Sequence, residues 1–133
     1  MNRREEQVPP RRGLMRIETQ AVDEAGQLVF RGQMDVDALN LMVMAETREN
    51  LARSKGRAFV EHMISSFGAQ LVEAAKSGQG QSEVDKAAMT VAMAAWLMDS
   101  IYGGVTAEAF MKSDLRFTMF PGGAVKYDRI PTN

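Results

Sequence analysis

Apolar residues recur with a helical period between residues 82 and 102, and this segment is apolar on more than one side. At about 100° per residue, its alanines and valines gather on one face, whereas Met89, Met93 and Trp96 gather on another. A helix of this kind needs cover on two sides, so it lies at the centre of a core or takes part in an interface. The segment therefore predicts a long helix around which the rest of the chain packs.

A second helical stripe of bulky apolar side chains precedes it, between residues 60 and 75. A glycine-containing loop at residues 77–81 separates the two patterns, and so short a connection makes the flanking helices antiparallel neighbours. We therefore predict a central helical hairpin of about residues 57–77 and 82–102. The small side chains of the later helix allow the bulky stripe of the earlier one to approach closely.

An earlier helix is predicted at about residues 37–53, and it too is apolar on two sides. Leu41 and Met44 lie on the opposite side from a face formed by Leu39, Met42 and Val43. This helix therefore needs more cover than one neighbouring element provides.

The joint between this helix and the central hairpin contains Gly56. Extended backwards, the stripe of the later helix passes through polar residues only, among them Glu46, Glu49 and Arg53. Either the helix breaks near Gly56, or the segment 37–77 is one helix whose middle projects beyond the core. We favour the break, because glycine inside a helix costs about 1 kcal/mol relative to alanine.

Alternating apolar and polar residues near both ends of the chain predict two β-hairpins, at residues 14–31 and 115–129. Glycine-containing turn sequences separate the strands in each hairpin, at residues 23–26 and 121–123. A lone hairpin is marginally stable in water, so each is expected to pack on something else. The whole pattern predicts an α+β fold in which residues 13–133 form a single globular domain.

Residues 1–12 are expected to be a flexible basic arm outside this domain. The arm contains Pro9-Pro10, which favours extended polyproline geometry, and it carries the arginines Arg3, Arg4, Arg11 and Arg12. A second basic group lies at the joint after the 37–53 helix and consists of Arg53, Lys55 and Arg57. A nucleic-acid-associated accessory protein that uses these two groups is our alternative hypothesis, although neighbouring glutamates reduce the charge of both.

Composition narrows the chemistry that the chain can perform. Its 133 residues carry a net charge of −1 and include no cysteine, which excludes disulfides and thiolate chemistry. The only histidine, His62, lies opposite the apolar stripe of its helix and is interpreted as an incidental surface residue. The sequence contains no catalytic, metal-binding or dinucleotide-binding motif, so we predict a non-catalytic protein without a cofactor. Because it has neither a secretory signal nor an apolar span, we expect a cytoplasmic location.

Surplus apolar surface leads to the principal hypothesis, a small protein–protein interaction module that acts as an assembly subunit, adaptor or regulator. We expect it to associate with itself or with another protein through residues of the types enriched at interfaces. The candidate interface residues are Met89, Met93, Trp96, Leu41 and Met44. The alternative is that the chain's own sheet covers the Met89–Met93–Trp96 face, and the sequence leaves both arrangements open.

Overall fold

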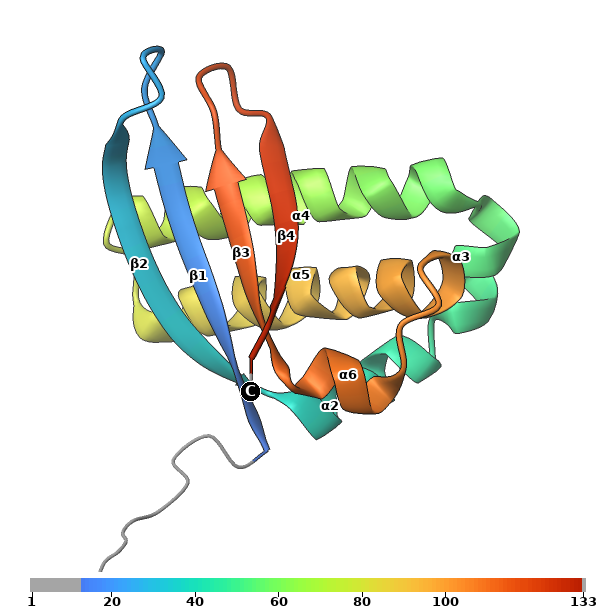
Figure 1. Ribbon diagram of the computed structural model, residues 1–133. Coiled ribbons are helices and arrows are strands. Elements are labelled where there is room, and N and C mark those ends of the chain that lie inside the picture. The colour runs from blue at the N-terminus through green and yellow to red at the C-terminus, as the bar shows by residue number, and fades with distance from the viewer. Residues whose placement is uncertain (1–12, 133) are drawn as a thin grey trace, which may run out of the picture.

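A computed structural model describes residues 13–132, which form a four-stranded sheet with helices across one face (Figure 1). The strands are β1 (Leu14–Val22), β2 (Leu28–Asp37), β3 (Ser113–Met119) and β4 (Val125–Pro131). The helices are α2 (Ala38–Glu46), α3 (Glu49–Lys55), α4 (Arg57–Lys76), α5 (Gln81–Tyr102) and α6 (Ala107–Met111). The α+β class expected from the sequence is confirmed. The basic arm expected at residues 1–12 lies outside the described residues.

The N-terminal pair of strands and the C-terminal pair meet in the middle of the sheet, whose strand order is β2-β1-β3-β4. β1 pairs with β2 and β3 with β4 in antiparallel fashion, whereas β1 and β3 run parallel, with Ile17 opposite Leu115. One face carries the apolar positions of β1 and β3 and is covered by α4 and α5. The other face is polar at its centre, where Arg116 forms an ion pair with Glu18 at 3.0 Å. The parallel pairing was not part of the sequence prediction.

β2 is longer than the hairpin predicted at residues 14–31, because it continues through Gly32 to Asp37. A Cβ atom at position 32 would lie 3.1 Å from both the Phe30 ring and Thr19 Oγ1, so glycine allows these side chains to approach the strand closely. β2 then leads directly into α2. The carboxylate of Asp37 caps that helix by accepting a hydrogen bond from Asn40 N at 3.0 Å.

The single helix predicted at residues 37–53 is in fact two helices, α2 and α3. Thr47 Oγ1 and Arg48 Nη1 both donate to the carbonyl oxygen of Met44, at 2.8 and 3.1 Å. Both side-chain bonds compete with the backbone for the carbonyl of Met44, near the end of α2. Arg48 has a φ of −116° and a ψ of 1°, so the chain turns before α3 begins.

The break expected near Gly56 is confirmed. Gly56 has a φ of 95° and a ψ of 171°, a conformation that is essentially restricted to glycine, and it separates α3 from α4. The segment 37–77 therefore forms three helices. The two helices that follow, α4 and α5, lie side by side behind the sheet (Figure 1), where segments of about 57–77 and 82–102 were expected.

Buried side chains form two clusters in the described part of the chain. The larger lies between the sheet and the pair α4–α5, and includes Ile17, Leu71 and Phe117. The smaller joins α2 and α3 to α4 and α5, and consists of Ala45, Ala52, Val60, Met93 and Leu97. The second cluster fixes α2 and α3 near the C-terminal half of α5, which is where the candidate site lies. Within residues 13–132, no helix is both long and apolar enough to cross a membrane.

One polar atom in the core, Thr19 Oγ1, is buried without a hydrogen-bond partner among the described residues. Valine has nearly the same shape as threonine and lacks the hydroxyl group. We therefore expect Thr19→Val to raise the free energy of unfolding by about 1 kcal/mol, because it removes an uncompensated polar group. Urea unfolding of the variant and the wild type measures the difference. If Thr19→Val instead lowered the free energy of unfolding by a similar amount, the Thr19 hydroxyl group would have a hydrogen-bond partner in solution.

Candidate functional site

α2 presents large apolar side chains to solvent, although it also contributes to the core. Ala38, Leu41 and Ala45 are buried, but the side chains of Leu39 and Val43 are 64% and 59% exposed. Isolated apolar residues on a surface are ordinary, but these two lie one turn apart on the same side of a short helix. They are therefore a candidate contact surface.

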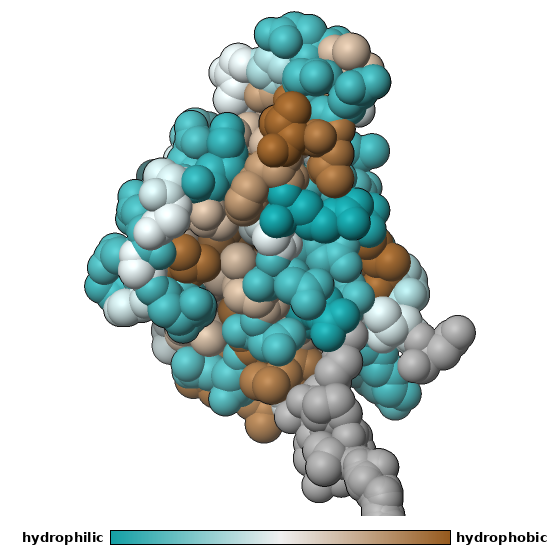
Figure 2. Space-filling view, turned by 90° about the vertical axis from the view of Figure 1, so that its left-hand side faces the viewer, coloured by the Kyte–Doolittle hydropathy of each residue, from teal (hydrophilic) through white to brown (hydrophobic). Residues whose placement is uncertain are grey.

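A groove of about 460 Å³ runs beside these residues, between α2 and α5; we call it the α2–α5 groove. Buried Ala45 and Leu97 form part of its lining, while Glu46, Glu49 and the other lining residues reach its surface. Its lining comprises Leu39, Met42, Val43, Ala45, Glu46, Glu49, Trp96, Leu97 and Ser100. In Figure 2, hydrophobic side chains reach the surface at the lower end of the molecule, at the height where Figure 1 places α2.

Trp96 supplies an aromatic wall for the groove. Its side chain is only partly buried, and its ring lies 4.9 Å from the ring of Phe110, centre to centre, with an angle of 49° between the planes. Phe110 is fully buried in α6, so this contact holds the indole in place. The groove therefore combines a fixed aromatic surface with the exposed aliphatic side chains of α2.

The two carboxylates of the groove differ in their surroundings. Glu49 Oε2 forms an ion pair with Arg53 Nε at 2.9 Å, one turn further along α3. Glu46 is exposed and forms no ion pair within residues 13–132. The far end of α2 therefore gives the groove one uncompensated negative charge.

The interface residues predicted from the sequence fall into two groups. Leu41 and Met93 are 0% and 3% exposed, so they belong to the chain's own core and offer no surface to a partner. Met44, Met89 and Trp96 are partly buried and pack against the two clusters. Of the predicted set, only Trp96 lines the α2–α5 groove.

Leu39 and Val43 were not among the interface candidates predicted from the sequence, although the sequence contained the relevant signal. Both lie on one of the two apolar faces of α2, and the projection shows two faces without showing which one packs inward. The inward face is the one that carries Ala38 and Ala45 beside Leu41, because small side chains allow α2 to approach α5 closely. The face with the larger exposed area is left for other contacts.

The basic group predicted at the α3–α4 joint is largely engaged in local contacts. Arg53 pairs with Glu49, Arg57 Nε lies 3.3 Å from Glu61 Oε2, and the Lys55 ammonium lies 6.0 Å from the centre of the Phe59 ring. The arginines at positions 3, 4, 11 and 12 lie outside the described residues. His62 is exposed, and residues 13–132 contain no cluster of three or more His, Asp or Glu side chains that could hold a metal ion.

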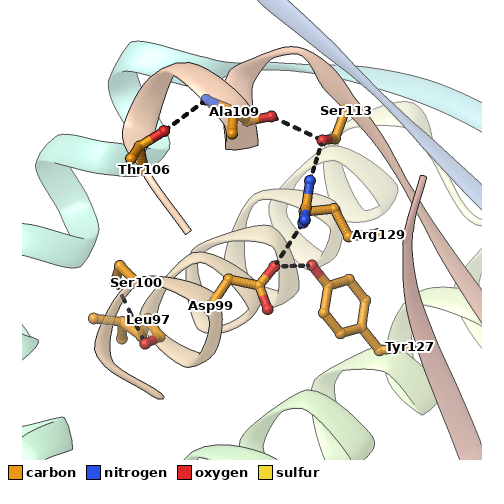
Figure 3. A network of polar contacts seen from close by, with 8 residues as sticks. All are labelled: Leu97, Asp99, Ser100, Thr106, Ala109, Ser113, Tyr127 and Arg129. Carbon is orange, nitrogen blue, oxygen red and sulfur yellow. Dashed lines mark hydrogen bonds and ion pairs between the residues drawn. The ribbon is translucent and has the colours of Figure 1, made fainter. Parts of the chain in front are cut away.

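A polar network at the C-terminal end of α5 is the most buried group of charges described here. Figure 3 shows Asp99 pointing from α5 toward β4, where Tyr127 Oη donates to its Oδ2 at 2.7 Å and Arg129 Nε lies 3.6 Å away. Arg129 Nη1 donates to Ser113 Oγ at 2.9 Å, and Ser113 Oγ donates to the carbonyl oxygen of Ala109. The network ties α5, α6, β3 and β4 together, which is a structural role.

Burial shifts the titration of two members of this network. Desolvation raises the pKa of Asp99, although the Tyr127 hydrogen bond and the Arg129 charge oppose the shift. Desolvation also raises the pKa of Tyr127, and the nearby Asp99 carboxylate adds to the effect. The tyrosine therefore keeps its proton and acts as the donor.

The raised pKa of Asp99 gives its stability contribution a definite pH dependence. The folded chain holds this proton more tightly than the unfolded chain, whose value is near 3.8, so the contribution is complete below that value. It is lost as the pH rises through the folded pKa. We therefore expect Asp99→Asn, which does not titrate, to gain stability relative to the wild type as the pH rises from below 3.8. Urea unfolding of both proteins at a series of pH values, starting below 3.8, measures the two free energies of unfolding. If the stability of Asp99→Asn relative to the wild type fell as the pH rose, the prediction would be wrong.

Comparisons with models of protein families, with curated proteins and with solved structures find no match to this chain. We therefore infer the function from the α2–α5 groove and from the chemistry of its lining.

Proposed function

We propose that this protein is a non-catalytic interaction module that associates with a second copy of itself through the α2–α5 groove. The observation that carries this proposal is the exposure of Leu39 and Val43 beside a groove with an aromatic wall. Aromatic and large aliphatic side chains at the centre of a contact supply most of the binding energy of protein interfaces. Covering them removes apolar surface from water.

The chemistry of the lining favours binding over catalysis. The groove offers a single hydroxyl group, Ser100 Oγ, which lies 3.4 Å from the carbonyl oxygen of Leu97 and donates to it. Of its two carboxylates, Glu49 is paired with Arg53. A catalytic site needs groups that are held near one another and near a reacting atom, and within residues 13–132 no hydrogen bond joins two polar side chains of this lining.

A second copy is the partner best supported by charge. The groove carries the carboxylate of Glu46, which forms no ion pair within residues 13–132, and the chain contains four arginines within residues 1–12. The complementary charge is therefore present in the same polypeptide. The alternative function, contact with nucleic acid, has less support because Arg53 and Arg57 already form ion pairs with glutamates.

Sedimentation velocity over a range of protein concentrations tests the proposal. We expect the wild type to associate reversibly and Val43→Glu to weaken the association about tenfold or more, because it places a charge in the apolar contact. Asn40→Glu is the matched control, since it adds the same charge to an exposed position of α2 that does not line the groove. A wild type that stays monomeric, or equal losses in both variants, would contradict the proposal.

A further inference from the structure

We infer that residues 8–12 of one copy, Val-Pro-Pro-Arg-Arg, occupy the α2–α5 groove of another copy. This inference rests on the proposed function and names the element that one copy contributes to the other. Three observations carry it: the kinds of side chain in the groove, the position of its unpaired charge, and the place where the chain enters the sheet.

The apolar part of the groove suits a proline-containing segment. Two consecutive prolines favour the extended polyproline conformation, so little conformational freedom is lost when the segment binds. Such segments bind in grooves lined by aromatic side chains, and Trp96 supplies that surface here. Leu39 and Val43, from α2, offer exposed apolar surface that matches Val8 and the proline rings in chemistry.

The charged end of the groove suits the arginines that follow the prolines. Glu46 has no ion-pair partner within residues 13–132, and Glu49 shares its charge with Arg53. Arg11 and Arg12 come directly after Pro10, so a segment whose prolines lie against Trp96 has its positive charge at one end only. In the segment the apolar residues precede the charged ones, and in the groove the apolar surface likewise leads to the carboxylate of Glu46.

The point of entry of the chain favours an arm from a second copy over the chain's own arm. The carbonyl oxygen of Gly13 accepts a hydrogen bond from Ala38 N at 2.9 Å, so the chain enters the fold beside the first turn of α2. Gly13 therefore lies toward the apolar end of its own groove, and Arg12 directly precedes it in the sequence. Glu46 lies eight residues further along α2, which corresponds to about 12 Å of helix. An arm that reaches its own groove from Gly13 has its arginines nearest the apolar end, whereas an arm from another copy is free to run the other way.

Exchange of arms between two copies predicts a closed dimer. If the arm of the first copy occupies the groove of the second, two-fold symmetry places the arm of the second in the groove of the first. Each pair of copies then forms two equal contacts, and no groove or arm is left over. The expected product is a dimer rather than a filament.

A charge exchange between two full-length variants tests the inference. The first variant carries Glu46→Arg in the groove, and the second carries Arg11→Glu with Arg12→Glu in the arm. Each variant alone opposes like charges in both contacts of its dimer, so we expect its self-association to weaken about tenfold. In a one-to-one mixture every arm meets a groove of opposite charge. We expect the mixture to form a heterodimer within about threefold of the wild-type affinity.

Sedimentation velocity and the fluorescence of Trp96, the only tryptophan of the chain, read out the result. A heterodimer whose formation changes the Trp96 emission and weakens with added salt supports the inference. Association that persists undiminished in the arm variant overturns it, but leaves the proposed function standing if Val43→Glu still abolishes association. The third outcome has two parts: the mixture stays monomeric, and a single chain with all three substitutions regains the wild-type Trp96 emission. This outcome assigns the arm to the groove of its own chain and overturns the exchange between copies.

Discussion

Replacing Leu41 with alanine should lower the free energy of unfolding by about 2–5 kcal/mol, whereas Leu39→Ala should change it by less than about 0.5 kcal/mol. The two leucines are separated by one residue of α2, and both are apolar positions in the sequence pattern. Leu41 is fully buried, so its truncation leaves a cavity, whereas Leu39 is 64% exposed. Urea unfolding at a protein concentration at which sedimentation detects only monomer measures both effects.

The Leu39 and Leu41 variants also separate stability from association. Leu39→Ala is expected to weaken self-association while leaving unfolding nearly unchanged, because the proposed dimer covers this exposed side chain and the core of the monomer does not. Equal destabilisation by the two substitutions would show that Leu39 is packed inside the monomer. The α2–α5 groove would then not exist in solution as described.

The substitution Gly56→Ala should cost about 1–3 kcal/mol of folding free energy. The φ of 95° and ψ of 171° at this position are compatible with glycine but strained for alanine. Open space surrounds the position, with no atom within 4 Å of an added Cβ, so the cost comes from the backbone alone. Thermal or urea unfolding measures it.

Ser54→Ala is the matched control for Gly56→Ala. Ser54 is exposed in α3, two residues earlier, and alanine is a good helix former, so we expect a change within about 0.5 kcal/mol. If Gly56→Ala were as harmless as the control, α3 and α4 would be able to form one continuous helix. The second cluster, which depends on the turn between them, would then have to be packed differently.

The sequence predicted those features of the fold that depend on local pattern. The 20-residue helix α4 and the 22-residue helix α5 carry clear apolar stripes, and the polar gap before α4 indicated the break at Gly56. Features that depend on pairing or on competition for one carbonyl were not predicted. The parallel register of β1 and β3 joins residues about 100 positions apart, and periodicity within each strand says nothing about it. The division of α2 from α3 depends on two side chains that bond to the carbonyl of Met44.

The candidate site was predicted only in part, for a related reason. Periodicity identified Trp96 and showed that the 37–53 segment is apolar on two sides. It assigned Leu41 to the interface and left out Leu39, because a projection does not show which face a neighbouring element covers. Leu97 and Met93, contributed by α5, settle the matter: they pack with Ala45 and Ala52 and leave Leu39 and Val43 outside. Only the placement of α2 against α5 makes that distinction.

The central claim, that a second copy covers the α2–α5 groove, is tested most directly by acrylamide quenching of Trp96 in the full-length protein. We expect the quenching constant to fall as protein concentration rises, over the same range in which sedimentation shows dimers forming. Val43→Glu should keep the high, monomer-like quenching constant throughout that range. A quenching constant that stays the same while the protein dimerises would place the contact elsewhere on the molecule and contradict the account.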